Sequence, residues 1–500
     1  MTRATVAGSV RHVRRRVLRP DLVLLASAVL GGALVGRSLA NGEIAVAGIV
    51  AGFVVIVALA QAKWLPYVAC VAIVGSFAVP PDLPQLGVPG SPYLSDLVLV
   101  AAFAAWFFML GRAHVLGPGA FPVGPQVAVG LLLLGGLVGV FVGASNGVEF
   151  TDAMRHARDI LFYATFWLAL TAFSDRSALS LVLKLGAWTA VAIVLAQVAQ
   201  GMLGTSTLLF YVTDPLQELI TCADGPCADP KAEGFPRVRP PGLVLVYATA
   251  CFAASYLLWG PRRRRAAVSL LLAICLVGIF VSLNRNMLIG LVAGVGLAGL
   301  LAARRGRLAA VITVGAVILV VSAAAAGGSP GVRESTVLER VTTLTSLSEL
   351  ESSQGFQSRL LENRYALRAL AGSPLVGLGW GVSDGLTEIK FRNGEFRTEQ
   401  PLFVHQQYLH IWERAGLLGL AGLLTALALS VVSGARWLRR VEDESAWLGA
   451  GVVSAVTAIA VSSLVGIYIV NPASAPVLAG LFALATVLQR ELGQRFTSGR

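Results

Sequence analysis

Charged side chains are scarce in this chain. Only 13% of its 500 residues are Asp, Glu, Lys or Arg, whereas 56% are hydrophobic, and the mean hydropathy is +0.75. This balance excludes a soluble multidomain protein. It predicts a polytopic helical membrane protein, because apolar runs of ~20 residues are what the bilayer core requires.

Several motifs are also missing, and each absence removes a class of function. The sequence contains no G-x-x-x-x-G-K-S/T motif, which argues against nucleotide-driven transport. The polar loops expected outside the membrane hold no Asp-x-Asp motif or carboxylate cluster of the kind that binds a catalytic divalent ion, so neither a metal nor a cofactor is expected. The net charge of +12 comes without a basic module interleaved with aromatic residues, so nucleic acid is not an expected partner.

What the chain does contain is a series of apolar segments. We expect fourteen membrane spans, and 12 or 13 remain possible because the segments 65–79 and 473–488 are short. The segments lie near 22–40, 43–61, 65–79, 96–110, 122–144, 157–173, 178–203, 242–259, 266–283, 287–303, 308–326, 415–433, 446–470 and 473–488. This pattern predicts an all-α integral membrane protein.

Basic clusters between the spans indicate the orientation in the membrane. They lie at Arg11–Arg19, Arg262–Arg265, Arg304–Arg307 and Arg436–Arg440, and in the tail at Arg490, Arg495 and Arg500. If the first cluster is cytoplasmic, all the others fall on the same side, as the positive-inside rule requires. Both termini are then cytoplasmic, and the long polar connections 204–241 and 327–414 lie outside. The first apolar segment is expected to be a signal anchor in the plasma (inner) membrane, because it lacks a convincing cleavage site.

These spans divide the chain into three parts. Residues 1–326 hold eleven spans and the outer loop 204–241, residues 327–414 form a large outer loop, and residues 415–500 hold the last spans and the cytoplasmic tail. Within the large loop, Ser358 to Ala371 alternates leucines with arginines and predicts an amphipathic helix along the outer surface. Gly372-Ser373-Pro374 ends that helix, and a glycine-rich turn follows.

The five cysteines agree with this sidedness. Cys70, Cys251 and Cys275 lie within apolar spans and are expected to be small buried hydrophobic residues. Cys222 and Cys227 lie in the first outer loop, where the oxidising compartment favours a disulfide between them. A zinc site would need further ligands nearby, and the loop provides none.

Four stretches follow one another in a characteristic order. They are Arg237-Val238-Arg239-Pro240-Pro241-Gly242 before a span, Ser282-Leu283-Asn284-Arg285 between two spans, Ser358-Arg359 through Ser373-Pro374 to Gly377-Leu378-Gly379-Trp380-Gly381, and His405 followed by Glu413, Gly416 and Gly419. Together they resemble the O-antigen ligase and polymerase family of membrane glycosyltransferases, over roughly residues 237–420. The chain departs from the family pattern at Gln406, where asparagine or serine is common, and at Asn284, which adds a residue to the serine-arginine spacing.

The resemblance implies a fold and a reaction. The fold would be of the GT-C type, with about 12–14 transmembrane helices and an extracytoplasmic active site. The reaction would move a saccharide from a polyprenyl-diphosphate carrier to the hydroxyl of a glycan, glycolipid or protein, with inversion and without a metal. The donor would enter laterally from the outer leaflet, so membrane lipids are partners as well.

Arginine chemistry suits such a donor independently of the resemblance. A departing diphosphate gains negative charge, and guanidinium groups bind phosphate oxygens bidentately while remaining charged. Arg285, in a short outer turn, is the best candidate, and interfacial snorkelling is the alternative. Arg239 and Arg237 flank a helix start and are further candidates, with a merely charged surface as the alternative. Arg359 would support the loop or the donor.

A histidine is the expected general base. An imidazole titrates near neutrality without special tuning, and His405 precedes the last helix entry from the outside. His410 is expected to pack or hydrogen-bond, and Glu413 either to orient a neighbour or to occupy the first turn of a helix. Tyr408 and Trp412 suit an aromatic belt or a contact with the lipid-linked glycan.

Two arginines before the span 157–173 leave both interpretations open. Arg155 and Arg158 are one turn apart and share a helix face. They either extend the cationic site to a second phosphate or pair with Asp152 and Asp159.

Two rival functions remain. A polymerase of the same family would use similar groups on a repeat-unit acceptor. A secondary transporter or an anion channel would also display intramembrane arginines, but here the arginines and His405 gather at the outer face beside a long outer loop, which favours the enzyme.

Overall fold

The computed structural model describes somewhat more than half of the chain, all of it after residue 120. The described residues are 121–203, 212–213, 237–238, 240, 242–282, 284–302, 354–386, 388–392, 395–399, 404–442, 444–471 and 473–498. The expected spans before residue 111 and the span 308–326 lie outside these ranges. So do Arg239, Cys70, Cys222 and Cys227.

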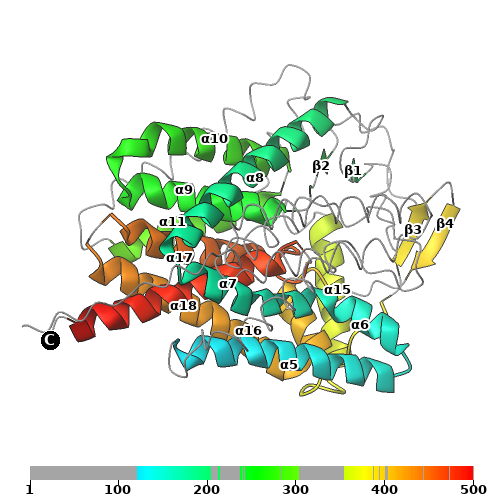
Figure 1. Ribbon diagram of the computed structural model, residues 1–500. Helices are drawn as coiled ribbons and strands as arrows, with labels where there is room; N and C mark the ends of the chain where they lie inside the picture. The colour runs from blue at the N-terminus through cyan, green and yellow to red at the C-terminus, as the bar shows by residue number, and fades with distance from the viewer. Residues whose placement is uncertain are drawn as a thin grey trace, which may run out of the picture.

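The described chain is almost entirely helical (Figure 1). Its helices are α5 (Val123–Ser145), α6 (Phe150–Leu161), η1 (Phe162–Ala164), α7 (Thr165–Phe173), α8 (Arg176–Leu203), α9 (Leu243–Trp259), η2 (Arg262–Arg264), α10 (Arg265–Val281), α11 (Arg285–Ala302), α15 (Gln354–Leu370), α16 (Gln407–Arg440), α17 (Ala446–Ser462) and α18 (Ala475–Ser498). Two short antiparallel ribbons accompany them, β1 (Val212–Thr213) with β2 (Arg237–Val238) and β3 (Glu388–Arg392) with β4 (Glu395–Glu399).

Five helices of the described part are long and apolar enough to cross a membrane, namely Val123–Ser145, Arg176–Gln200, Arg262–Val281, Gln407–Arg440 and Ala475–Arg495. Three shorter apolar helices, Leu243–Trp259, Asn286–Leu301 and Ala446–Ser462, run among them. The predicted all-α membrane fold is therefore confirmed.

Polar side chains join the shorter apolar helices within the core. The buried Tyr247 hydroxyl of α9 donates to the Met287 carbonyl of α11 at 2.6 Å and lies 3.0 Å from the Ser462 hydroxyl of α17. In lipid there is no competing water, so such bonds and close packing hold helices together where the hydrophobic effect cannot. The two cysteines of this region, Cys251 and Cys275, are free and buried, as expected.

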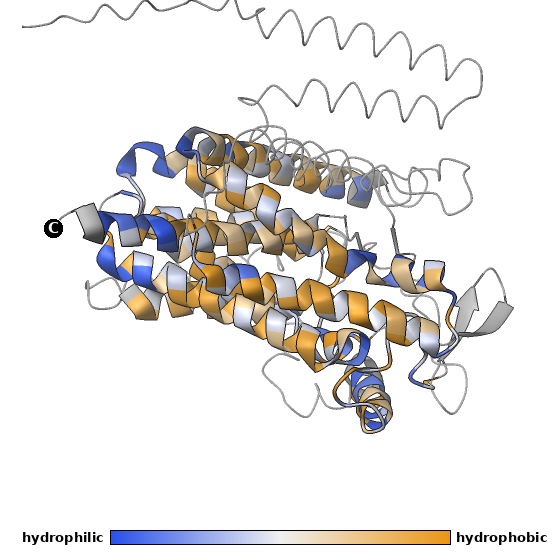
Figure 2. Ribbon diagram, turned by 60° about the horizontal axis from the view of Figure 1, so that its bottom comes forward, coloured by the Kyte–Doolittle hydropathy of each residue, from blue (hydrophilic) through white to orange (hydrophobic). Residues whose placement is uncertain are grey.

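The helix ends gather at two opposite ends of the bundle (Figure 2). We call one the basic end, defined by Arg176, Arg262–Arg265, Arg436, Arg439, Arg440, Arg490 and Arg495. There Arg176 contacts Glu491 at 3.0 Å, and Arg495 lies over the Trp437 ring at 5.1 Å. We call the other the site end, where α5 and α17 end and α11, α16 and α18 begin.

Two spans differ from their expected form. The segment expected as one span at 157–173 is the end of the amphipathic α6, a 3-10 turn and the nine-residue α7. Charged residues fill one face of α6, so only α7 is apolar all round. The span expected at 446–470 ends at Ser462, because the following residues form turns whose backbone groups bond other helices.

Candidate active site

The stretches that contain Arg285 and His405 meet at the site end. Asn286, beside Arg285 at the start of α11, donates to the Ser462 carbonyl at 3.3 Å and accepts from the Tyr468 hydroxyl at 3.1 Å. Gln407, which follows His405, donates its backbone N–H to the Ser463 carbonyl at 3.1 Å, and its side chain accepts from Val470 at 2.7 Å. The turn 462–470 thus joins the two helix starts. The backbone of Arg285 belongs to this arrangement, and its side chain lies outside the described part.

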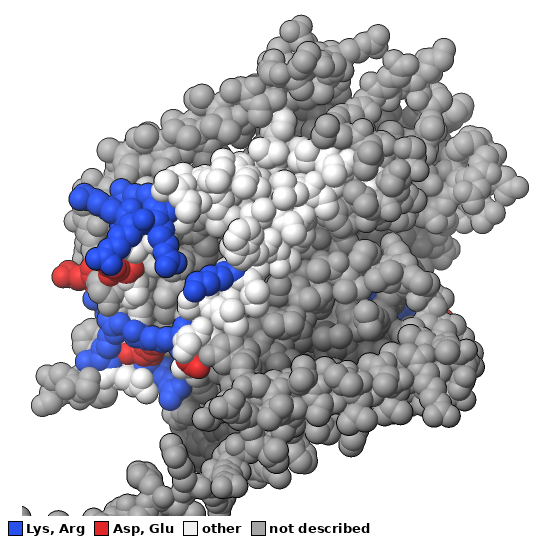
Figure 3. All heavy atoms as spheres, turned by 45° about the horizontal axis from the view of Figure 1, so that its top comes forward, with Lys and Arg blue, Asp and Glu red and all other residues white. Residues whose placement is uncertain are grey.

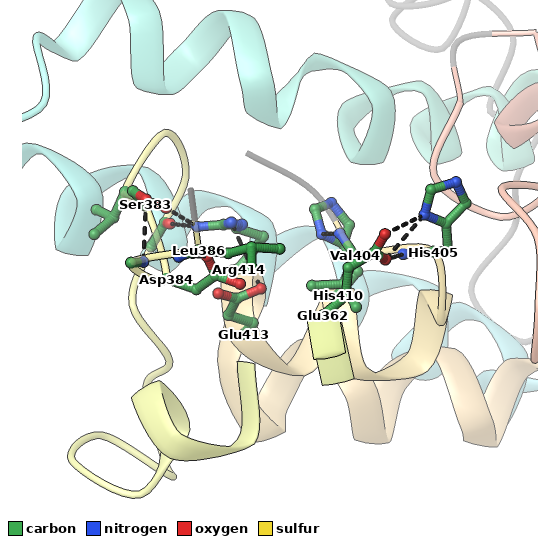
Figure 4. Close-up of polar contacts among 12 residues, drawn as sticks. Glu362, Ser383, Asp384, Leu386, Val404, His405, His410, Glu413 and Arg414 are labelled. Carbon is green, nitrogen blue, oxygen red and sulfur yellow. Dashed lines mark hydrogen bonds and ion pairs between the residues drawn. The ribbon is translucent and has the colours of Figure 1, made fainter. Parts of the chain in front are cut away.

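His405 is fixed by a carboxylate from α15 (Figure 4). Its Nδ1 atom lies 3.0 Å from Oε1 and 2.9 Å from Oε2 of Glu362, and its backbone N–H donates to Oε2 at 3.0 Å. The Glu362 side chain is 5% exposed and the His405 side chain 33% exposed. The carboxylate is therefore enclosed, and the imidazole reaches from it toward the surface.

This pairing determines what the imidazole can do. An ionised carboxylate only accepts hydrogen bonds, so the proton of a neutral imidazole belongs on Nδ1. The lone pair then lies on Nε2, on the far side of the ring from Glu362. A carboxylate in this position sets the tautomer and orientation of a histidine that acts as a general base.

Glu362 was not predicted from the sequence as a site residue, yet the pattern held a signal. Glu362, Ala366 and Leu370 form the buried stripe of α15, at spacing i, i+4, i+8. Ala366 and Leu370 pack with Val404 and Leu409 at the start of α16. A carboxylate in an apolar stripe needs a partner, and that requirement could have drawn attention to it.

The glycine-rich turn after α15 is bound closely to α5 and to the first segment of α16. The Leu378 N–H donates to the Glu413 carbonyl at 2.7 Å, and the Trp380 indole N–H donates to the Gly136 carbonyl at 3.0 Å. Gly379 has a φ of +88°, and a Cβ there would lie 2.2 Å from the Gly143 nitrogen. Only glycine satisfies both conditions, so the turn has one position against the bundle.

A break in α16 lets this turn enter. Gly416 has a φ of 68°, outside the helical region, and it separates a short first segment of α16 from the long apolar one. The Leu417 N–H donates to the Leu375 carbonyl at 2.9 Å in place of a helix partner. The histidine-bearing segment is thereby attached to the membrane-spanning part through the turn.

Two adjacent charges are buried beside the break. The Arg414 and Glu413 side chains are 1% and 0% exposed, and their nearest charged atoms lie 3.5 Å apart. Arg414 also donates to the Gly379 carbonyl at 3.3 Å and to the Val382 carbonyl. Neither Glu413 oxygen has a hydrogen-bond donor among the described residues. Glu413 therefore does not lie in the first turn of α16, and that it orients a neighbour stays a prediction. Arg414 holds the turn through the two carbonyls that it binds.

The other polar residues of this segment bond within the protein. His410 is 4% exposed, and its Nδ1 accepts from the Val404 N–H at 3.3 Å. The Tyr408 hydroxyl donates to the Ala460 carbonyl at 2.7 Å, and the Trp412 indole donates to the Pro374 carbonyl at 2.7 Å. His410 packs as expected, and glycan contact by Tyr408 stays a prediction.

On α6 the two arginines take different partners. Arg155 pairs with Asp152 at 2.9 Å, and the Arg158 guanidinium lies 5.1 Å from the Phe162 ring centre. Burial, and then the charge of Arg414, lowers the pKa of His156 below its ordinary 6.5. Arg155 thus forms one of the expected carboxylate pairs, and contact of either arginine with phosphate or glycan stays a prediction.

The remaining candidate arginines are placed only in part. Arg359 lies one turn before Glu362 on α15 and shares its face. Arg237 forms part of β2, paired with Thr213, and its side chain lies outside the described part.

Among the described residues no three His, Cys, Asp or Glu side chains come close enough to hold a metal ion, and metal independence stays a prediction.

The comparison with known families fits this arrangement. Residues 269–424 match the family model described as O-antigen ligase, from α10 through the first half of α16. No curated protein matches the chain. The matched region contains Arg285, Arg359, Glu362 and His405, so this part of the chain, about a third of its length, is similar to the O-antigen ligase family.

Proposed function

We propose that the protein transfers a saccharide from a polyprenyl-diphosphate carrier to a hydroxyl group, with His405 as the general base. The observation that carries this proposal is the His405–Glu362 pair, at 2.9 Å, at the end of the bundle where Arg285 begins α11. The family implies glycosyltransferase-like chemistry with a glycan-linked lipid donor and a glycan acceptor. The carrier and the roles of the residues are our inference.

The proposed step is a direct displacement. His405 Nε2 removes the proton of the acceptor hydroxyl, and the oxygen attacks the anomeric carbon of the donor sugar. The bond between that carbon and the diphosphate oxygen breaks, and the bonding electrons leave with the diphosphate. Attack opposite the leaving group inverts the anomeric centre. Glu362 keeps the imidazole in position and stabilises the imidazolium that forms.

The arginines stabilise the leaving group. Arg285 and Arg239 would hold the diphosphate, because fixed guanidinium groups compensate the charge that develops on it. Arg237 would support them from β2, and Arg359 would support α15 or the donor. Arg155, Arg158 and Tyr408 would contact the glycan at the periphery.

The proposal includes a sidedness. The basic end would face the cytoplasm together with both termini, and the site end would be extracytoplasmic. A reporter fused after Arg265 should therefore indicate a cytoplasmic position, and one inserted near Gly394, between β3 and β4, an external one. The opposite result at either position would reverse the assignment.

The function is tested by glycan transfer from a purified polyprenyl-diphosphate-linked saccharide to a glycan acceptor in proteoliposomes. His405→Ala should lower the transfer rate by about a hundredfold or more while donor binding persists. EDTA should leave the wild-type rate unchanged. Gel filtration checks that the variant is folded. A folded His405→Ala protein that transfers glycan at the wild-type rate would show that the histidine is structural and the mechanism wrong.

The same assay distinguishes the two activities of the family. With the donor alone, a polymerase would lengthen the saccharide on its carrier, whereas a ligase would need a separate glycolipid, glycan or protein acceptor. The acceptor that supports transfer therefore identifies the activity, and His405→Ala should abolish either one.

A further inference from the structure

A groove opens between helices of the bundle, and its lining does not include His405. It has a volume of about 540 Å³ and is lined by α8, α9, α10 and α18 together with the start of α17. Its walls are mostly apolar and include Leu183, Leu245, Phe252, Leu481 and Leu484. The volume falls within the range of about 300–1,000 Å³ that is usual for small-ligand sites.

The groove ends among cations at the basic end. Arg176, Lys184 and Arg264 all line it, and Glu491 is the acidic residue among the lining residues. Glu491 is already paired with Arg176 at 3.0 Å. Lys184 and Arg264 are exposed and make no ion pair with any described residue. Figure 3 shows Lys and Arg side chains gathered at one end of the molecule, beside an uncharged surface.

The position of Lys184 is informative. It lies two turns beyond Arg176 on α8, which is ~12 Å along the helix axis. A lysine this far into an apolar helix face is costly unless its ammonium reaches the interface or an anion. The apolar walls and the two cations, Lys184 and Arg264, together fit a ligand with a hydrocarbon chain and an anionic headgroup.

We propose that this groove binds an anionic phospholipid of the leaflet that surrounds the basic end. One acyl chain lies along α9 and α18, and the phosphate lies between Lys184 and Arg264. Basic pockets between transmembrane helices recognise anionic headgroups in this way. The glycan donor does not fit the same description, because its diphosphate must reach the site end, where His405 and Arg285 are.

The test uses the full-length protein, equilibrated in micelles with equal amounts of phosphatidylglycerol and phosphatidylcholine. Native mass spectrometry counts the lipids that stay bound. Wild type should retain phosphatidylglycerol in preference. The Lys184→Gln/Arg264→Gln variant should retain roughly tenfold less of it. Arg262→Gln/Arg263→Gln is the matched control, because it removes the same charge from the same end outside the groove, and it should retain the wild-type amount.

A second variant tests the apolar wall without altering charge. A Cβ at Gly186 would meet Leu245 Cδ1 at 3.8 Å, an ordinary contact, so Gly186→Leu adds its side chain to the groove without a backbone clash. It should reduce retention of the bound lipid with the cations intact. Equal retention of the two lipids by wild type, equal losses in the groove variant and its control, or undiminished binding in Gly186→Leu would each overturn the proposal.

Discussion

The two ends of the helix bundle hold their charges in different ways. At the site end, Glu362, Glu413 and Arg414 are 5% exposed or less, and hydrogen bonds or an ion pair fix them. At the basic end, Arg262 and Arg263 are exposed and make no ion pair with any described residue. Buried charges are costly unless they are paired, so a protein retains them where their geometry matters. Exposed arginines need only their positive charge, which in the proposed orientation would face the cytoplasm.

The largest effect is expected from breaking the buried pair. Arg414→Ala should destabilise the folded protein by about 3–5 kcal/mol, because it leaves Glu413 buried without a counter-charge and releases two carbonyls of the turn. Arg263→Ala at the basic end should change stability by less than ~0.5 kcal/mol. Unfolding by denaturant in detergent measures both. Similar values for the two variants would show that burial does not distinguish the ends.

Arg285 tests whether a cation at the site end acts on the substrate. Arg285→Ala should lower glycan transfer by about a hundredfold, because the departing diphosphate loses a fixed guanidinium. Arg285→Lys should restore little, since an ammonium cannot form the bidentate contact. Arg262→Ala, which removes an arginine from the basic end, should transfer at the wild-type rate. Full rescue by lysine would mean that only the charge at this position is needed.

Glu362 is expected to act through His405. Glu362→Gln should lower kcat by roughly tenfold and leave KM for the donor unchanged, because an amide can occupy the same space but cannot fix the ring as a carboxylate does. Arg364→Gln, on the exposed face of the same helix, is the control and should have no effect. Steady-state kinetics separate the two parameters. A rise in KM with constant kcat would assign Glu362 to substrate binding instead.

The smallest effect concerns His156 of α6, whose pKa is lowered mainly by burial and then by Arg414. The folded protein therefore takes up this proton less readily than the unfolded chain. The stability contributed by neutral His156 is present above pH 6.5 and declines as the pH falls below that value. Thermal unfolding at about pH 7.5 and about pH 5.5 should show a smaller loss in His156→Gln than in wild type. An identical loss would exclude a contribution from this histidine.

Most of the helical framework follows from hydropathy. The spans expected at 178–203, 242–259, 266–283 and 287–303 agree closely with α8, α9, α10 and α11, because each is a single apolar run between polar residues. The amphipathic helix expected at 358–371 is the larger part of α15. These features are local, so a short window of sequence is enough to predict where each helix lies.

The features that were missed depend on distant contacts. His405 and Glu362 are 43 residues apart, and nothing in either neighbourhood specifies the other. Arg414 resembles an interfacial arginine near the start of a span, and only the folded turn supplies the Gly379 and Val382 carbonyls that it binds. The span predicted from hydropathy at 446–470 was also longer than α17. The residues after Ser462 are largely apolar, but their backbone groups form turns and bond other helices.

The segment between Leu386 and Val404 is held at both ends. Arg414 fixes the Val382 carbonyl before it, and Glu362 fixes the His405 N–H after it. The β3–β4 hairpin lies within this segment and takes part in neither contact. In evolutionary terms, the hairpin can therefore change in sequence without loss of the two contacts that anchor the proposed base.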